Sequence, residues 1–186
     1  TKPYIYSRYT MDNPKRVIKI AVCGPLKAGK STITNILAEQ ADQLGGSPDT
    51  YTPTVGVRIL EVEKEVFSAG RVSVELWDVS GDQRFETCWP AIQKDTNAVI
   101  LVYNPDHPAH DQEVGIWYDF FVKGSGLTDD QCMAYMHFSD PNQAGNRVRP
   151  PPKLQNTSSV VRSSTEQVPL IIQSFEEFLR TVVTRS

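Results

Sequence analysis

The sequence predicts an α/β domain in which a mostly parallel sheet carries helices on both faces. Strand and helix patterns alternate along most of the 186 residues, and this order is typical of layered α/β folds. The run at 98–103 (AVILVY) is apolar throughout, as expected of a strand that is covered on both sides. A glycine-rich turn at 24–31 follows an apolar strand pattern and precedes a helical one. We expect one domain at residues 17–186, preceded by a polar N-terminal arm at residues 1–16.

Each element is expected from its local pattern. Apolar or alternating runs bounded by turn residues predict strands, and apolar positions at helical spacing predict helices. Gly70 supplies the turn between the second and third strands. The expected strands are 17–23, 57–67, 72–78, 98–103 and 133–138, and the expected helices are 32–44, 84–95, 111–123 and 166–183.

The segment from residue 140 to residue 154 breaks this alternation. Its three consecutive prolines, 150–152, cannot continue a helix and favour an extended backbone. We expect a surface loop here, either a solvated connector or a docking peptide for another protein.

Charge, cysteine content and hydropathy argue against several classes of protein. The net charge is −3, whereas nucleic-acid-binding proteins usually present a basic face, so we expect no nucleic-acid partner. Cys23, Cys88 and Cys132 are widely spaced and are expected to be buried, reduced thiols of a cytoplasmic protein. No window approaches the roughly 18 consecutive apolar residues of a transmembrane helix. The final residues, 184–186, hold no cysteine for prenylation and the chain does not begin with Met-Gly, so we expect no direct membrane anchor.

The turn at residues 24–31 (GPLKAGKS) fits the phosphate-binding pattern G-x-x-x-x-G-K-[ST]. Between a strand and a helix, the backbone N–H groups of such a turn face a phosphate, and the Lys30 ammonium adds a positive charge. The Ser31 hydroxyl can bind Mg²⁺. The alternative is a glycine-containing turn that binds nothing, but chance rarely supplies both flanking elements.

Two further motifs suit a nucleotide switch. Asp78 closes a strand in the run WDVSG and can hold a Mg²⁺ water, while the Gly81 N–H can reach a γ-phosphate. Thr54, in the polar loop before the second strand, places a hydroxyl where it completes the metal shell. Each motif alone is weak, but their order around the phosphate-binding turn is a strong signal.

On these motifs, and on Arg84-Phe85 after them, the chain resembles the Ras-superfamily small GTPases, the Rab branch in particular, over nearly its whole length. The resemblance implies the small G-domain of the P-loop NTPases, with a six-stranded sheet, GTP or GDP and Mg²⁺ as ligands, and the fourth helix replaced by the Pro-rich loop. It implies metal ligation by Ser31, Thr54 and Asp78. The residues expected to contact the nucleotide are Lys27, Ala28, Gly29, Lys30, Ser31, Thr32, Thr54, Gly81, Phe138, Asp140, Ser158 and Ser159.

The residues after Gly81 depart from the family pattern. Where the family generally has a glutamine that orients the attacking water, this chain has Asp82, with Gln83 one place later. A carboxylate is repelled by a triphosphate and lacks the amide's donor, so we expect very slow GTP hydrolysis. Leu26 stands where the family generally has a small residue, and we expect it either to crowd the γ-phosphate or to block an arginine finger. Lys30 and Gln83 remain the candidate catalytic residues, because Gln83 can substitute if its loop shifts.

Base recognition also departs from the family pattern. The [NT]-K-x-D motif is HFSD at 137–140, so only the aspartate, Asp140, remains to accept the N1–H and N2–H groups of guanine. Phe138 either stacks on the base or packs in the core. The family's later S-A-K loop is matched to residues 156–160, with the Ser159 N–H offered to the guanine oxygen.

A degenerate base motif, no lipid anchor and an unusual switch together resemble the Rab-like small GTPases of intraflagellar transport complex B. That resemblance implies a cilium or flagellum and partners among the coiled-coil subunits of the complex, which bind in a nucleotide-dependent way. An alternative is an active small GTPase of vesicle or membrane traffic, completed by Gln83 or by a partner residue. An adenine-nucleotide enzyme such as a small kinase is disfavoured, because no arginine-rich lid can be found in the sequence.

Overall fold

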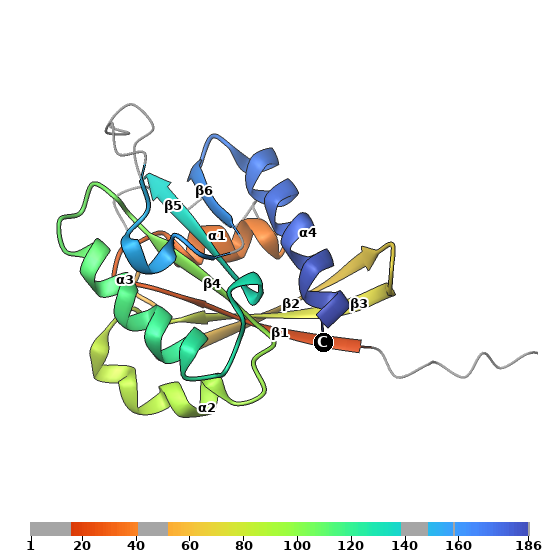
Figure 1. Ribbon diagram of the computed structural model, residues 1–186, viewed down its shortest axis with the longest axis horizontal. Coiled ribbons are helices and arrows are strands. Elements are labelled where there is room, and N and C mark those ends of the chain that lie inside the picture. Colours follow the sequence, from red (N-terminus) through yellow and green to blue (C-terminus); the bar gives the residue numbers. More distant parts are fainter. Residues whose placement is uncertain (1–15, 41–51, 139–148, 158, 186) are drawn as a thin grey trace, which may run out of the picture.

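Six strands form one sheet in the order β2-β3-β1-β4-β5-β6, shown in the computed structural model of Figure 1, which describes residues 16–40, 52–138, 149–157 and 159–185. The strands β2 and β3 are antiparallel, and every other neighbouring pair is parallel. The expected mostly parallel six-stranded sheet is confirmed. The strands are β1 Arg16–Cys23, β2 Val57–Val66, β3 Gly70–Val79, β4 Ala98–Tyr103, β5 Cys132–Phe138 and β6 Ser159–Ser164.

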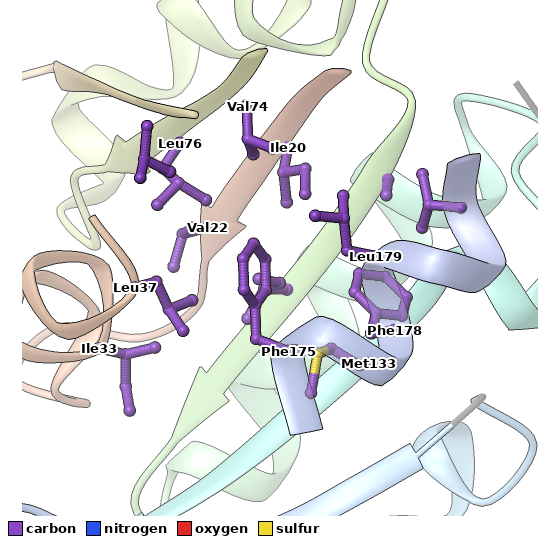
Figure 2. Close-up of a cluster of buried hydrophobic side chains, with 14 of the residues drawn as sticks. Ile20, Val22, Ile33, Leu37, Val74, Leu76, Met133, Phe175, Phe178 and Leu179 are labelled. Atoms are coloured by element: carbon purple, nitrogen blue, oxygen red, sulfur yellow. The ribbon is translucent and has the colours of Figure 1, made fainter. Parts of the chain in front are cut away.

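Helices cover both faces of this sheet, as the alternating pattern predicts. The helices α1 (Lys30–Leu37) and α4 (Val168–Arg185) pack on one face, where Ile33 and Phe175 join the side chains of the central strands (Figure 2). The helices α2 (Trp89–Gln93) and α3 (His110–Tyr118) pack on the other, where Trp89 and Trp117 meet with ring centroids 4.3 Å apart. All six residues of β4 are buried, which confirms the prediction from its unbroken apolar run.

All four helices differ from their predicted bounds, and the helix expected at 166–183 is α4, which begins and ends two residues later. The helix expected at 32–44 begins at Lys30 and ends at Leu37, because Glu39 takes a left-handed conformation with φ 58°; residues 41–44 lie outside the described residues. The helix expected at 84–95 is a 3-10 helix, Gln83–Cys88, followed by the short α2, since Pro90 has no N–H to extend an α-helix backwards. The helix expected at 111–123 is α3 followed by a π-helical turn, Asp119–Lys123.

The described part of the Pro-rich segment, residues 149–154, lies against α3. It contains a 3-10 turn at Pro152–Leu154, in which the Leu154 side chain is fully buried. The Lys153 ammonium forms an ion pair with Asp119, and a Cβ added at Gly115 would lie 3.2 Å from Cδ of its side chain. This anchoring favours the connector over the docking peptide. Residues 139–148 lie outside the described residues.

The three cysteines are free thiols. Burial raises the pKa of Cys23 and Cys132, as expected for inert core thiols. The expectation that all three are buried is wrong for Cys88, which is exposed because the 3-10 helix that carries it has no buried residues. Within the described residues, no helix combines the length and the apolar character needed to cross a lipid bilayer.

Candidate nucleotide-binding site

A pocket of about 490 Å³ opens where the carboxyl ends of the parallel strands meet, the usual ligand position in open α/β sheets. It is bounded by the turn after β1, the start of α1, the loop before β2, the end of β3 and the ends of β5 and β6. The lining residues are Leu26, Lys27, Ala28, Gly29, Lys30, Ser31, Thr32, Thr52, Pro53, Thr54, Ser80, Gly81, His137 and Thr165.

The turn at residues 24–31, called the phosphate loop from here on, needs its two glycines. Gly24 has φ +144°, and a Cβ added there would lie 2.1 Å from the carbonyl oxygen of Val102. Gly29 has φ +93° and caps α1 without any side-chain hydrogen bond to the helix N-terminus. The N–H groups of the first helical turn are therefore left for another acceptor, as a phosphate would be.

Lys30 carries a buried positive charge at the floor of this pocket. Its side chain is only 6% exposed, and Nζ donates to the Pro25 carbonyl at 2.6 Å. Burial lowers the pKa of Lys30 to about 8, although the nearby Asp78 carboxylate partly opposes this shift. A phosphate in the pocket would supply a second anion for this ammonium.

Three oxygen-bearing side chains converge beside Lys30 in an arrangement that fits Mg²⁺. Ser31 Oγ and Thr54 Oγ1 are 3.0 Å apart, and Thr54 Oγ1 lies 3.4 Å from Asp78 Oδ2. Asp78 is fully buried and pairs with Arg58 at 3.2 Å, yet its Oδ1 forms no hydrogen bond to any residue that the structure describes. Burial also raises the pKa of Asp78. A buried carboxylate oxygen without a partner, next to two hydroxyls, is the set of hard oxygen donors that this cation prefers.

Gly81 brings the loop after β3 into direct contact with the phosphate loop. A Cβ at this position would lie 2.6 Å from the Leu26 nitrogen and 2.7 Å from Lys30 Nζ. Any side chain would push the two loops apart, so the backbone of Gly81 is held close to the ammonium. Leu26 also lines the pocket, with 36% of its side chain exposed, which places it where we expect it to crowd the end of a triphosphate.

Asp82 and Gln83 do not line this pocket. Asp82 instead caps the 3-10 helix: its carboxylate accepts from the Arg84 N–H at 2.9 Å and from the Arg84 guanidinium at 2.6 Å. These hydrogen bonds lower the pKa of Asp82. Gln83 is exposed, so the predicted catalytic role of Gln83 requires its loop to move.

Of the two roles expected for Phe138, stacking on the base and packing in the core, the structure supports the second. The ring is 3% exposed, packs within the cluster under α3 and does not line the pocket. The Arg162 guanidinium lies over it at 5.0 Å. Phe138 therefore packs in the core and does not stack on a base, because it lies on the face of β5 that α3 covers, opposite to its neighbour His137. Asp140 and Ser158 lie outside the described residues.

The match of Ser159 to the guanine-binding loop is wrong. Ser159 is the first residue of β6 and pairs with Met133, while Ser164 pairs with Phe138. Five residues of parallel strand separate these ends by about 16 Å, so Ser159 lies at the edge of the sheet opposite the pocket. The apolar pair 160–161 is followed by Arg162 and then by the run SST at 163–165, and Thr165 of this run lines the pocket. This run was the sequence signal that we missed.

His137 is a second residue that the sequence analysis missed. It lines the pocket, is buried, and its Nδ1 lies 3.1 Å from Ser163 Oγ. Burial lowers the pKa of His137 to about 4, so the ring is neutral at physiological pH.

This shift predicts acid sensitivity. The unfolded chain takes up a proton at His137 near pH 6.5 and the folded chain only near pH 4, so stability falls as the pH drops through that window. The full loss is about 3 kcal/mol. Chemical denaturation at pH 7 and pH 5 should show a smaller pH dependence for His137→Asn than for wild type. Equal slopes for the two proteins would contradict the assignment.

A family model described as Roc, "Ras of Complex, Roc, domain of DAPkinase", matches residues 19–136. An intraflagellar transport protein 22 homolog from Danio rerio is 38% identical over 172 residues, covering 89% of this chain and 90% of that protein. The GDP-bound T. brucei IFT22 crystal structure aligns with a TM-score of 0.70 and 28% identity over 91% of this chain and 98% of that one. A chain of the GTP-bound T. brucei IFT22/74/81 crystal structure aligns with a TM-score of 0.67 and 27% identity over 92% of this chain and all of that one (100%).

Proposed function

Because this chain belongs to the intraflagellar transport protein 22 family of Ras-like small GTPases, we propose that it is a GTP-binding subunit of the intraflagellar transport machinery. It acts in the cilium or flagellum, and its bound nucleotide controls its binding to protein subunits of complex B. In this proposal residues 17–186 form one G domain. The observation that carries the proposal is the convergence of Lys30, Ser31 and Thr54 on one pocket, with the buried Asp78 carboxylate behind them, 3.4 Å from Thr54 Oγ1.

Different residues are proposed to contact the phosphates, the metal ion and the base. The N–H groups of the phosphate loop and the Lys30 ammonium hold the β- and γ-phosphates. Ser31, Thr54 and Asp78 would hold Mg²⁺, which neutralises phosphate charge when bound. The remaining phosphate contacts that we propose come from Lys27, Ala28, Gly29 and Thr32, all of which line the pocket. Asp140 is proposed to accept from guanine N1–H and N2–H.

Two loops in this pocket can report which nucleotide is bound. Thr54 precedes β2 and Gly81 follows β3, and both lie at the end of the pocket that Lys30 occupies. A γ-phosphate would accept a hydrogen bond from the Gly81 N–H and would share a Mg²⁺ ion with the Thr54 hydroxyl. A diphosphate has no γ-phosphate and offers neither contact. The triphosphate therefore orders a surface that a partner can bind.

The partner is proposed from the relatives. The T. brucei structure that aligns over 92% of this chain is an IFT22/74/81 complex in the GTP-bound form. We propose the counterparts of IFT74 and IFT81 as partners, bound through their coiled-coil parts. Calorimetry should give at least about tenfold tighter binding to these partners with a non-hydrolysable GTP analogue than with GDP. Thr54→Ala should abolish the difference and Lys64→Ala, at the distant Glu39 pair, should keep it. Equal affinity in both states, or uptake of ATP in preference to GTP, would contradict the proposal.

Hydrolysis is proposed to be very slow, since neither Asp82 nor Gln83 reaches the pocket. Asp82→Gln should raise the single-turnover rate of GTP hydrolysis at least about tenfold, because an amide can both accept from and donate to the attacking water. Arg84→Ala is the matched control: it breaks the pair with Asp82 without adding an amide, and its rate should stay at the wild-type level. An equal increase in both variants would instead assign the effect to the broken pair.

A further inference from the structure

The imidazole of His137 lies between the phosphate loop and β6. A Cβ built on Gly29 would lie 2.4 Å from its Cδ2 and 3.1 Å from its Nε2, so this edge of the ring rests against the Gly29 backbone. At the other edge, Nδ1 is 3.1 Å from the buried Ser163 hydroxyl. The side chain is 2% exposed. The ring therefore fills the space between two elements that are distant in sequence.

Gly29 decides where the first helical turn points. It is the N-cap of α1, its backbone has φ +93°, and its carbonyl accepts from the Ile33 N–H at 3.0 Å. Lys30 and Ser31 follow it directly. A shift of Gly29 would turn the uncapped N–H groups away from the phosphate position, so the support under Gly29 determines the geometry of the phosphate loop.

We propose that His137, held by Ser163, is a positioning residue for the phosphate loop and does not recognise the base. The inference rests on the proposed nucleotide binding. Both edges of the ring meet protein groups, which leaves little of it for a base contact. Support of Gly29 acts equally on any ligand that carries the polyphosphate, whether or not a base is attached.

The test compares GTP with inorganic tripolyphosphate, which has the phosphates and no base. Both are titrated with Mg²⁺ into wild type and His137→Ala, with tripolyphosphate read by its displacement of a fluorescent GTP analogue. His137→Ala should weaken both ligands by the same factor, about tenfold, the scale seen when supporting residues of a site are removed. Ser163→Ala should weaken both by a smaller common factor, and His137→Asn should restore most of the affinity. Ser164→Ala, the neighbour on the opposite face of β6, should match wild type.

Two results would overturn the inference. One is a loss of GTP affinity with unchanged tripolyphosphate affinity, which would make His137 a base contact; the other is a folded His137→Ala with both affinities intact. If His137→Ala fails to fold, Ser163→Ala decides: a common loss supports the inference and an unchanged affinity overturns it. Wild-type protein that takes up neither ligand would overturn the proposed function, and this inference with it, before any variant is compared.

Discussion

Lys30→Met is expected to lower the affinity for GTP with Mg²⁺ about 100-fold. The substitution keeps the aliphatic stem and removes the ammonium, and a charge-assisted hydrogen bond to phosphate in a buried site is worth about 3 kcal/mol. Because burial already lowers the pKa of Lys30 to about 8, the folded chain holds this charge at a cost. The melting temperature without nucleotide should therefore stay near the wild-type value. Isothermal titration calorimetry and thermal unfolding measure the two effects.

Lys19→Met is the control for this experiment. Lys19 is also partly buried, and its ammonium lies 3.8 Å from the centre of the Trp77 ring, away from the pocket lining. Its loss should leave GTP affinity unchanged. A Lys30→Met protein that melts like wild type and binds GTP equally well would remove the basis for the phosphate site.

Asp78→Asn is expected to abolish most of the dependence of GTP affinity on Mg²⁺. The amide has nearly the same shape but no charge, so the buried oxygen without a partner becomes a much poorer metal contact. Loss of a group that orients a metal shell typically weakens metal affinity about 10- to 100-fold. In EDTA, the variant should bind GTP at least as well as wild type, because one negative charge near the triphosphate is gone.

The matched control is Glu75→Gln, a second carboxylate of β3, which accepts from the Trp77 indole N–H at 3.0 Å and does not line the pocket. Its response to Mg²⁺ should equal that of wild type. If Asp78→Asn kept the full Mg²⁺ response, the three-oxygen site would be wrong. If it lost affinity equally with and without Mg²⁺, the carboxylate would act on the phosphate loop instead of on a metal.

Elements with strong local patterns were predicted well from the sequence. The apolar run of β4, the hairpin of β2 and β3 and the phosphate loop each depend on neighbouring residues, so a short window contains the information. The structure brings Lys30, Ser31, Thr54 and Asp78 together, as the motifs implied. Their ligands remain a prediction for the experiments above.

The base end was predicted less well because it depends on pairing between distant segments. Whether Ser159 or Thr165 reaches the pocket is decided by the parallel register of β5 and β6, in which Met133 lies opposite Ser159. A polar run at the start of a strand and one at its end look alike in sequence. The place of Phe138 was uncertain for a related reason: a strand covered on both faces has no polar side to mark the pocket.

The sequence analysis did not predict that the Asp82 side chain is bound to Arg84, although the two residues are close in sequence. A carboxylate two residues before Arg84 caps the 3-10 helix and meets the guanidinium, which turns it away from the phosphates. The sequence contained this signal, but the expected alignment with a catalytic glutamine gave it another meaning.

The buried ammonium of Lys30 also affects how well the folded chain resists proteolysis. An unloaded molecule holds a buried charge that Asp78 offsets only in part, and each triphosphate that enters adds a second anion and its own binding energy to the folded state. Protease digestion of emptied protein should therefore run faster than digestion of loaded protein, and the abundance of the subunit in a cell should follow the guanine-nucleotide pool.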